Sequence, residues 1–194
     1  MIKVDQNCRA FIAQRALGSG IQNILFTDIR TVEDARECVR IVRAETPAAK
    51  GINGAANRRN VGYYLEAGSP EYAKAMDEAV VALMIEKKEA VDNLEEILSI
   101  DGIDMVQFGP GDYSLSLGCP RNHPRVKEVE LKIIKAAIKK GIRPRTEIGS
   151  IDYKIKDLQK YIELGVKDFS LPSDGKIVYE WLKKNGENIR KSLF

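Results

Sequence analysis

The hydrophobic and polar positions of the chain follow two periods, one typical of helices and one typical of buried strands. In residues 90–98, 126–140 and 155–164, apolar side chains recur every three or four positions, as on one face of a helix. Between such segments lie short apolar runs, among them "VVALMIE" (80–86) and "MVQF" (105–108). Nearly continuous apolar runs are typical of parallel strands that are covered on both faces. The pattern therefore predicts an α/β protein with a parallel sheet.

A unit of helix, glycine and strand repeats along the chain. A helical pattern ends at a glycine four times, at Gly20, Gly102, Gly141 and Gly165. Glycine fits these places because it adopts the left-handed conformation that closes a helix. We predict six strands, at residues 2–5, 23–28, 80–86, 104–109, 142–148 and 167–171. Six strands suit an open doubly wound sheet or part of a (β/α)₈ barrel, which needs eight strands and usually about 250 residues. The pattern alone leaves both architectures open.

Residues 44–78 interrupt this regular pattern. They are rich in Gly, Ala and Asn and show no clear period. We expect a long loop here, and loops of that length are more often functional or oligomer-forming than idle.

Composition narrows the class of protein. The 194 residues suit a single domain spanning 1–194. A net charge of +3, from 31 basic and 28 acidic residues spread along the chain, argues against a nucleic-acid partner. The longest apolar run, residues 79–85, is too short to cross a bilayer, so no membrane partner is expected. Cys8, Cys38 and Cys119 are odd in number and lack metal-ligand spacing, which favours a reduced cytoplasmic protein.

Two carboxylates follow neighbouring strands and are the first candidates for chemistry. Glu86 ends one predicted strand, and Asp112 follows the next strand along the chain. The carboxyl ends of parallel strands share one edge of a sheet, where ligands bind. Two carboxylates without a nearby His or Cys suit a hard divalent cation such as Mg²⁺ or Mn²⁺. The alternative is structural: Glu86 opens a helix, and Asp112 caps a turn that begins at Tyr113.

Gly109, Pro110 and Gly111 connect the predicted strand at 104–109 to the helix that follows it. The two glycines allow a ligand to approach the backbone closely. The amides of Gly111 and Asp112 would then face outward at a helix start, where an anion is favoured. A cation site beside an anion site suits a small 2-oxo acid. An ordinary tight turn is the alternative.

The residues 83–118, "LMIEKKEAVDNLEEILSIDGIDMVQFGPGDYSLSLG", resemble the HpcH/HpaI aldolase family. Its members are metal-dependent class II pyruvate aldolases with a (β/α)₈ barrel, related to citrate lyase β subunits. The similarity continues in "GIQNILFTDIRTVEDARECVRIVR", "NHPRV" and "LGVKDFSLPSD". The resemblance implies a TIM-barrel type fold in which the family's first two βα units have no counterpart here.

The resemblance also implies roles for individual residues. Glu86 and Asp112 match the family's ligands for a divalent ion (Mg²⁺, Mn²⁺ or Co²⁺). The amides of Gly111 and Asp112, in the turn with Gly109 and Pro110, match the group that holds the substrate carboxylate. Lys3 falls where the family places an arginine that polarises the 2-oxo oxygen. Secondary candidates are Met84, which replaces a glutamine near the metal, Glu147, with a solvated surface acid as the favoured reading, and Arg58 and Arg59.

The implied activity is cleavage of a 4-hydroxy-2-oxo acid to pyruvate, or a similar 2-oxo acid, and an aldehyde. The family's catalytic histidine belongs to the part without a counterpart, and we interpret His123 as a helix cap or surface residue. One alternative is a metal-binding barrel fragment with little or no activity. Another is a CoA-ester lyase of the citrate lyase β type, for which Arg58 and Arg59, expected on an exposed loop, are the nearest basic residues.

The resemblance further implies self-association, since the family forms hexamers. The last segment, residues 174–194, carries apolar side chains that would dock on a second copy or on the chain's own barrel.

Overall fold

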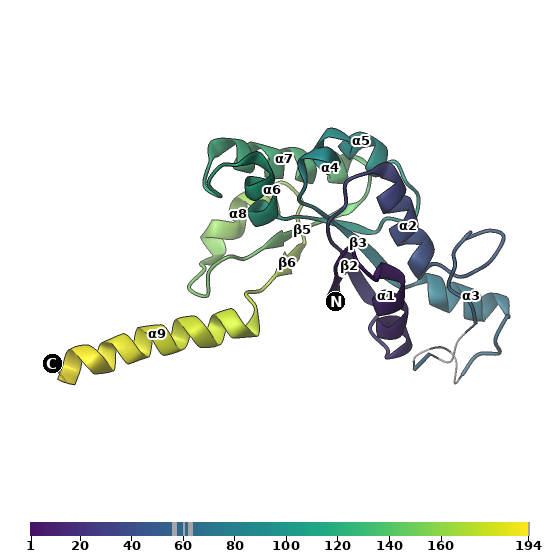
Figure 1. Ribbon diagram of the computed structural model, residues 1–194, viewed down its shortest axis with the longest axis horizontal. Coiled ribbons are helices and arrows are strands. Elements are labelled where there is room, and N and C mark those ends of the chain that lie inside the picture. The colour runs from purple at the N-terminus through teal and green to yellow at the C-terminus, as the bar shows by residue number, and fades with distance from the viewer. Residues whose placement is uncertain (56–57, 60, 62–63, 194) are drawn as a thin grey trace. The chain divides into compact units, whose positions relative to one another are not determined.

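The computed structural model describes residues 1–55, 58–59, 61 and 64–193 (Figure 1). The chain divides into two compact units, Met1–Pro144 and Arg145–Phe194. The prediction of one domain over 1–194 stays a prediction.

Parallel strands form the framework of both units. In the first unit, β1 (Ile2–Val4), β2 (Asn23–Phe26), β3 (Val80–Ile85) and β4 (Met105–Phe108) pair in chain order. β5 (Arg143–Glu147) and β6 (Asp168–Ser170) pair in parallel, with Arg145 opposite Asp168. The predicted α/β class and all six predicted strands are confirmed, each strand being one or two residues shorter than expected. The ends are lost because strand pairing stops where the chain turns into the loops that carry polar residues.

The helices alternate with these strands. The first unit contains α1 (Arg9–Gly18), α2 (Val32–Val42), α3 (Pro70–Asp77), α4 (Lys88–Asp92), α5 (Leu94–Ile97), α6 (Pro110–Leu117) and α7 (Pro124–Lys139), and the second contains α8 (Ile155–Glu163) and α9 (Asp174–Leu193). The glycines expected at helix ends all have positive φ: Gly20 at 94°, Gly102 at 90°, Gly141 at 74° and Gly165 at 99°. These angles confirm the predicted unit of helix, glycine and strand.

Residues 90–98, predicted as one helix, form parts of two short helices that meet at Asn93. The backbone of Asn93 leaves the helical region (φ −94°, ψ 14°), and its side-chain amide donates to the carbonyl of Arg30 at 3.3 Å. This contact competes with continued helix formation, because Asn side chains offer the chain alternatives to the helical hydrogen-bond pattern.

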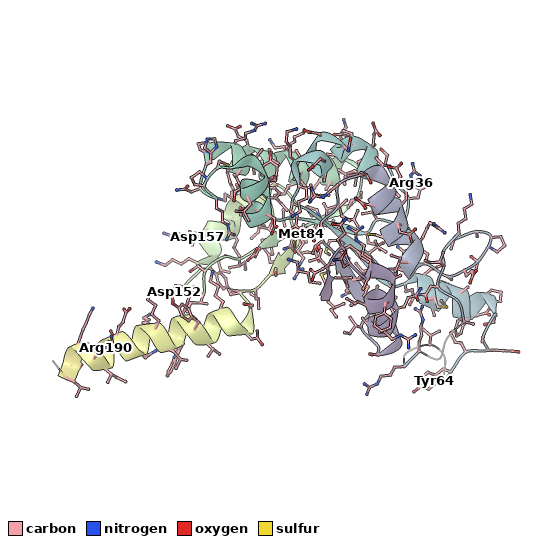
Figure 2. The ribbon with its side chains drawn as sticks, viewed as in Figure 1. Arg36, Tyr64, Met84, Asp152, Asp157 and Arg190 are labelled. Carbon is pink, nitrogen blue, oxygen red and sulfur yellow. The ribbon has the colours of Figure 1, made fainter. Side chains whose placement is uncertain are left out.

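The sheet of the first unit is buried on both faces. Along β3, Val81, Leu83 and Ile85 join the main core beneath the helices, whereas Ala82 and Met84 face the opposite side. Figure 2 shows Met84 among the strands and Arg36 on the outward side of α2. Full burial of a Leu or Ile side chain stabilises a fold by about 1.5–3 kcal/mol. A polar side chain within these buried strands would lose its hydrogen bonds to water, so polar side chains are favoured at the strand ends.

The segment 44–78 is more ordered than the sequence predicts. Residues 70–77 form α3, which begins at Ser69, whose hydroxyl accepts the N–H of Tyr72 at 3.1 Å. Pro70 occupies the first helical position, where its missing N–H costs nothing. The expectation of a loop across the whole segment is therefore wrong for α3, which Tyr72 and Met76 anchor in a small separate core.

No helix within the described ranges combines the length and the apolarity that crossing a bilayer requires.

Candidate active site

Polar residues gather where the strands of the first unit end. Asp5 follows β1, Thr27 and Asp28 follow β2, and Glu86 and Lys87 follow β3. Asp112 lies in the first turn of α6, directly after β4. Because the strands are parallel and paired in order, these residues share one edge of the sheet.

Glu86 is the most enclosed acid at this edge, with only 2% of its surface exposed. Its Oε1 accepts the N–H of Asp28 at 3.0 Å. Gly109 lies against the other side, where an added Cβ would stand 2.5 Å from Oε2. Burial raises the pKa of Glu86, and the charge of Asp112 raises it further, although the bond from Asp28 acts in the opposite direction. The negative charge of the Glu86 carboxylate is therefore only partly balanced by the groups around it.

Asp28 presents its N–H to Glu86 through an uncommon backbone conformation, with φ of 56°. Asp tolerates this left-handed region better than most residues. Arg9, which is 9% exposed, holds the turn from below by donating to the carbonyls of Thr27 at 2.9 Å and Asp28 at 3.2 Å. Arg9 also forms an ion pair with Asp34 at 3.1 Å. The position of the Asp28 amide is therefore fixed by buried contacts.

Lys87 joins two of the acids. Its Nζ lies 2.9 Å from Asp28 Oδ1 and 3.0 Å from Asp112 Oδ1. Burial alone would lower the pKa of Lys87, but the hydrogen bonds to both carboxylates raise it, so the side chain stays cationic. Although burial opposes it, hydrogen bonds from Lys87 and Thr27 lower the pKa of Asp28. Asp28 and Lys87 were not predicted as site residues, and their signal in the sequence is their place directly after two apolar strands.

The turn after β4 opens α6 in the way expected for an anion site. Gly109 is the N-cap and Pro110 the first helical residue, so Gly111 and Asp112 lie in the first turn. Amides of the first turn have no partner within the helix. Both positions also fit a structural role: Asp112 lies inside the first turn of α6 rather than before a turn at Tyr113, and Glu86 directly precedes Lys87, the N-cap of α4, so the helix dipole favours an acid at each.

Lys3 and Met84 also belong to this region. Lys3 on β1 is exposed, and its positive charge acts on Glu86, where it favours the ionised carboxylate. Met84 is 6% exposed, and its sulfur would lie 3.3 Å from a Cβ placed on Gly109. The structure therefore brings Lys3, Met84, Glu86 and Asp112 to one region, as their positions in the sequence indicate.

The remaining candidate residues belong to other elements of the chain. Glu147 is exposed at the end of β5 in the second unit, in keeping with a solvated acid. His123 is exposed and caps α7, its Nδ1 accepting the N–H of Arg125 at 3.2 Å, as interpreted from the sequence. Arg59 is exposed, but Arg58 is only 4% exposed, which corrects the expectation of an exposed loop for both. Arg58 was misjudged because its burial depends on contacts between distant segments.

The residues at the sheet edge fit a divalent cation. Within the described residues, Glu86 Oε2 and Asp112 Oδ2 accept no hydrogen bond, so each acid keeps one oxygen for a ligand. The electrostatic coupling of the two carboxylates is a repulsion that a cation would relieve. No group of three or more His, Cys, Asp or Glu side chains in the described part of the chain is placed to hold a metal. Water and substrate would have to complete the coordination, as Mg²⁺ commonly allows.

Parallel β/α units with acids gathered at the strand ends are typical of barrel-type proteins. The chain belongs to the HpcH/HpaI aldolase/citrate lyase family, whose model matches residues 1–180.

Two sequence relatives and one solved structure are similar to this chain. The chain is 32% identical over 154 residues to a 4-hydroxy-2-oxo-heptane-1,7-dioate aldolase of Escherichia coli, covering 78% of this chain and 56% of that protein. It is 34% identical over 131 residues to a 2-keto-3-deoxy-L-rhamnonate aldolase of Escherichia coli, covering 65% and 48%. The crystal structure of an HpcH/HpaI aldolase from Desulfitobacterium hafniense matches with a TM-score of 0.81 at 24% identity, covering 97% of this chain and 71% of that one. The chain thus spans about half the length of the two sequence relatives.

Proposed function

We propose that this chain binds a divalent metal ion and a small 2-oxo acid, and acts as an aldehyde-lyase on 4-hydroxy-2-oxo acids. The products would be pyruvate, or a similar 2-oxo acid, and an aldehyde. The observation that carries the proposal is the pairing of Glu86 with Asp112 at one sheet edge, each with an oxygen left for a ligand. The names of the two aldolase relatives support the same reaction class.

Glu86 and Asp112 would hold the ion, with Mg²⁺, Mn²⁺ and Co²⁺ as candidates. When bound, a divalent ion supplies positive charge beside the substrate oxygens that become negative during carbon–carbon cleavage. The buried bond from Asp28 to Glu86 and the bond from Lys87 to Asp112 would keep the two carboxylates in place before any ligand arrives. Such preorganisation is typical of sites that stabilise developing charge.

The remaining contacts would orient the 2-oxo acid. The first-turn amides of Gly111 and Asp112 would receive its carboxylate, which the N-terminal end of α6 favours. Lys3 adds a positive charge on the same side of the sheet. A lysine cannot form the two parallel hydrogen bonds that an arginine forms with planar oxygens, so its stabilisation of an enolate would be weaker.

A base for the 4-hydroxyl proton is the incomplete part of this site. The chain's single histidine, His123, caps α7 through its ring nitrogen. Asp28 is engaged by Lys87 and Thr27. Exchange of the methyl protons of the 2-oxo acid also needs a proton acceptor, for which solvent water is the candidate, but it needs no aldehyde to be positioned, so we expect binding and exchange to be more robust than full aldol cleavage.

Two assays separate these steps. Exchange of pyruvate methyl protons with D₂O, followed by NMR with Mg²⁺ or Mn²⁺, tests enolate formation without an aldehyde. Release of pyruvate from a 4-hydroxy-2-oxo acid, coupled to lactate dehydrogenase, tests cleavage. We expect metal-dependent exchange and slow cleavage, both lost in Glu86→Gln and Asp112→Asn. Absence of exchange at saturating metal and pyruvate would refute the enzyme proposal and favour a metal-binding protein without this chemistry.

We also propose that the chain forms a homo-oligomer through α9. No side chain of α9 is buried in the described part of the chain, although Ile177, Trp181, Leu182 and Ile189 are apolar and 44–62% exposed. Exposed apolar side chains at helical spacing are typical of docking surfaces. Light scattering should give a mass that is a multiple of the chain mass, and Trp181→Asp with Leu182→Asp should reduce it.

A cytoplasmic location belongs to the same proposal. Its support is chemical: all three cysteines are free thiols.

A further inference from the structure

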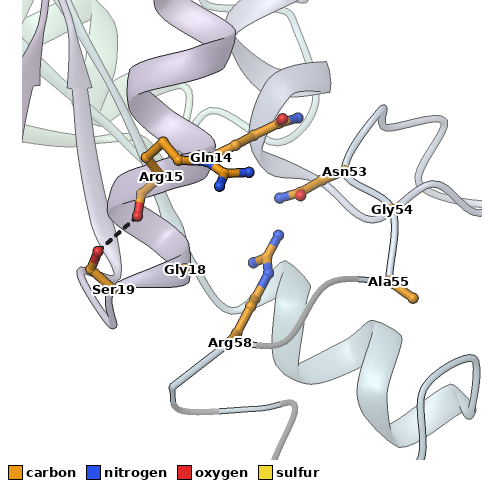
Figure 3. A pocket seen from close by; sticks show the side chains of 8 residues that line it. All are labelled: Gln14, Arg15, Gly18, Ser19, Asn53, Gly54, Ala55 and Arg58. Atoms are coloured by element: carbon orange, nitrogen blue, oxygen red, sulfur yellow. Dashed lines mark hydrogen bonds between the residues drawn. The ribbon is translucent and has the colours of Figure 1, made fainter.

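A cavity of about 580 Å³ lies between the end of α1 and the loop after α2 (Figure 3). Gln14, Arg15 and Ser19 line it on one side, and Asn53 and Arg58 on the other. Its volume is within the range of small-molecule sites, about 300–1,000 Å³. The cavity is remote from the acidic edge, because α1 ends beside the starts of the strands, whereas Glu86 and Asp112 follow their ends.

Two guanidinium groups meet in this cavity. Figure 3 shows Arg15 reaching in from α1 and Arg58 from the loop, with their charged ends directed toward the same space. Arg58 is 4% exposed, and its guanidinium forms no hydrogen bond or ion pair with any described residue. The side-chain nitrogens of Arg58 are not among the buried polar atoms that lack a partner, so their donors face the cavity, where water or a ligand can accept them. The meeting of two guanidinium groups at one cavity is the strongest indication that an anion completes the site.

The positive charge of Arg58 has no ion-pair partner among the described residues, and only longer-range charges act on it. Burial lowers the pKa of Arg58, while the charges of Tyr72 and Asp77 act in the opposite direction. Asp77 is itself engaged, its Oδ1 accepting the N–H of Ala44 at 2.7 Å. Glu45 lines a second cavity of about 240 Å³ with Tyr72, and this cavity shares Asn53, Gly54 and Ala55 with the cavity of Arg58. No carboxylate is among the described residues that line the cavity of Arg58.

The amide side chains of Asn53 and Gln14 line the cavity beside the two arginines and carry no charge that would neutralise them. Asn53 donates through Nδ2 to the carbonyl of Val42 at 3.1 Å, and Gln14 donates through Nε2 to the carbonyl of Ile52 at 3.5 Å. Both amides are thereby held at the cavity wall. Ser19 Oγ donates to the carbonyl of Arg15 at 2.9 Å, which reduces the negative partial charge at the end of α1.

From these observations we propose that the cavity is a binding site for the oxyanion group of a small molecule, a phosphate or a carboxylate, held between Arg15 and Arg58. Guanidinium forks match such groups with two parallel charge-assisted hydrogen bonds. The net charge of +3 is too small to gather anions over the whole surface, so the attraction is local. The site is separate from the proposed metal and oxo-acid site, and its ligand is a second molecule.

The test is calorimetric titration of the full chain with inorganic phosphate, glycerol phosphate and malonate, in EDTA and a buffer without other multivalent anions. We expect one saturable site with a Kd of about 1 mM or tighter for at least one probe. Binding by the two phosphates alone identifies a phosphate ligand, and binding by malonate alone identifies a carboxylate ligand. Thermal unfolding should shift upward with the same probe, since it binds the folded state.

Matched variants make the test specific. Arg15 is exposed, so Arg15→Gln leaves the core intact, and Arg58→Lys keeps the charge but loses the fork. Both should weaken binding by about tenfold or more. Arg59→Gln and Arg59→Lys change a neighbouring exposed arginine outside the cavity and should bind as the parent chain does. Glu86→Gln should also bind normally, even if the lyase proposal fails. Absence of saturable binding, or an equal loss in the Arg59 variants, would overturn the proposal.

Discussion

The ammonium of Lys87 lies 3.0 Å from Asp112 Oδ1, and so a cation of the protein itself already contacts one of the two proposed metal ligands. The same Nζ contacts Asp28 Oδ1 at 2.9 Å. A divalent ion held by Asp112 would be close to this ammonium, and the two positive charges would repel each other. Lys87 thus fixes Asp112 and at the same time limits the affinity of the site for metal.

Lys87→Met keeps an unbranched side chain of nearly the same length and removes its charge. We expect this variant to bind Mn²⁺ several-fold more tightly, because a repulsion between neighbouring cations is removed. Titration calorimetry at fixed ionic strength measures the change. Lys88→Met is the control, since Lys88 is exposed and paired with Asp92. Weaker Mn²⁺ binding in Lys87→Met than in the control would mean that positioning of Asp112 outweighs repulsion.

Gly109 and Gly111 give a matched pair of glycine substitutions. A Cβ at Gly109 would stand 2.5 Å from Glu86 Oε2 and 2.7 Å from Glu86 Cβ, whereas a Cβ at Gly111 meets nothing within 4 Å. We expect Gly109→Ala to displace Glu86, to destabilise the fold by about 1–3 kcal/mol and to impair metal binding. Gly111→Ala should retain both properties. Urea unfolding and Mn²⁺ titration check this, and equal behaviour of the two variants would contradict the close packing of Glu86 on Gly109.

Asp34 couples the start of α2 to the candidate site. Its Oδ2 accepts the N–H groups of Arg30 and Thr31, both at 3.0 Å, and its Oδ1 pairs with Arg9. Burial opposes ionisation, but these bonds lower the pKa of Asp34 below its ordinary value of 3.8. We expect Asp34→Asn to lower the free energy of unfolding by about 1–2 kcal/mol at neutral pH.

The pH dependence of this loss has a defined sign. The stabilisation by Asp34 is fully present above the pKa of the unfolded chain and is lost as pH falls through the lower pKa of the folded state. The difference between parent and Asp34→Asn should therefore be constant above about pH 4 and shrink at lower pH. Denaturant unfolding over this range measures it, with Glu33→Gln in the same helical turn as the control. A difference that grows on acidification would contradict the assignment.

The cysteines should differ sharply in reactivity. Cys38 is fully buried, and burial raises the pKa of its thiol to about 12, whereas Cys8 is exposed. Since the thiolate is the reactive form, we expect Ellman's reagent at pH 8 to modify Cys8 in the folded chain and Cys38 only after unfolding. Mass spectrometry of the labelled peptides distinguishes them. Modification of Cys38 at the rate of Cys8 would show that the core around α2 opens readily.

The strands and the two acids were predictable because their signals are local. Apolar runs ended by Glu86 and by Gly109 mark strand ends whatever the rest of the chain does. Helix-closing glycines such as Gly102 depend only on their own backbone. The resemblance of residues 83–118 then connected these positions to a family that the full comparison confirms over residues 1–180.

The missed features depend on contacts between distant segments. Lys87 meets Asp28 only because β2 and β3 are paired, and Asp28 reaches Glu86 only because its φ is positive. The burial of Arg58 likewise requires the loop after α2 to fold against α1. α3 was missed because Gly- and Ala-rich neighbours obscured its period, although Ser69 and Pro70 form a recognisable helix start.

Calorimetric titration of Mn²⁺ into the parent chain, Glu86→Gln and Asp112→Asn addresses most directly whether the two acids form one cation site. Glu89→Gln and Asp92→Asn provide the same chemical changes at exposed positions on the adjacent helix. We predict one bound ion in the parent and in both controls, and a loss of affinity of at least about a hundredfold in each of the other two variants. Unchanged Mn²⁺ affinity in Glu86→Gln and Asp112→Asn would show that these carboxylates do not share an ion.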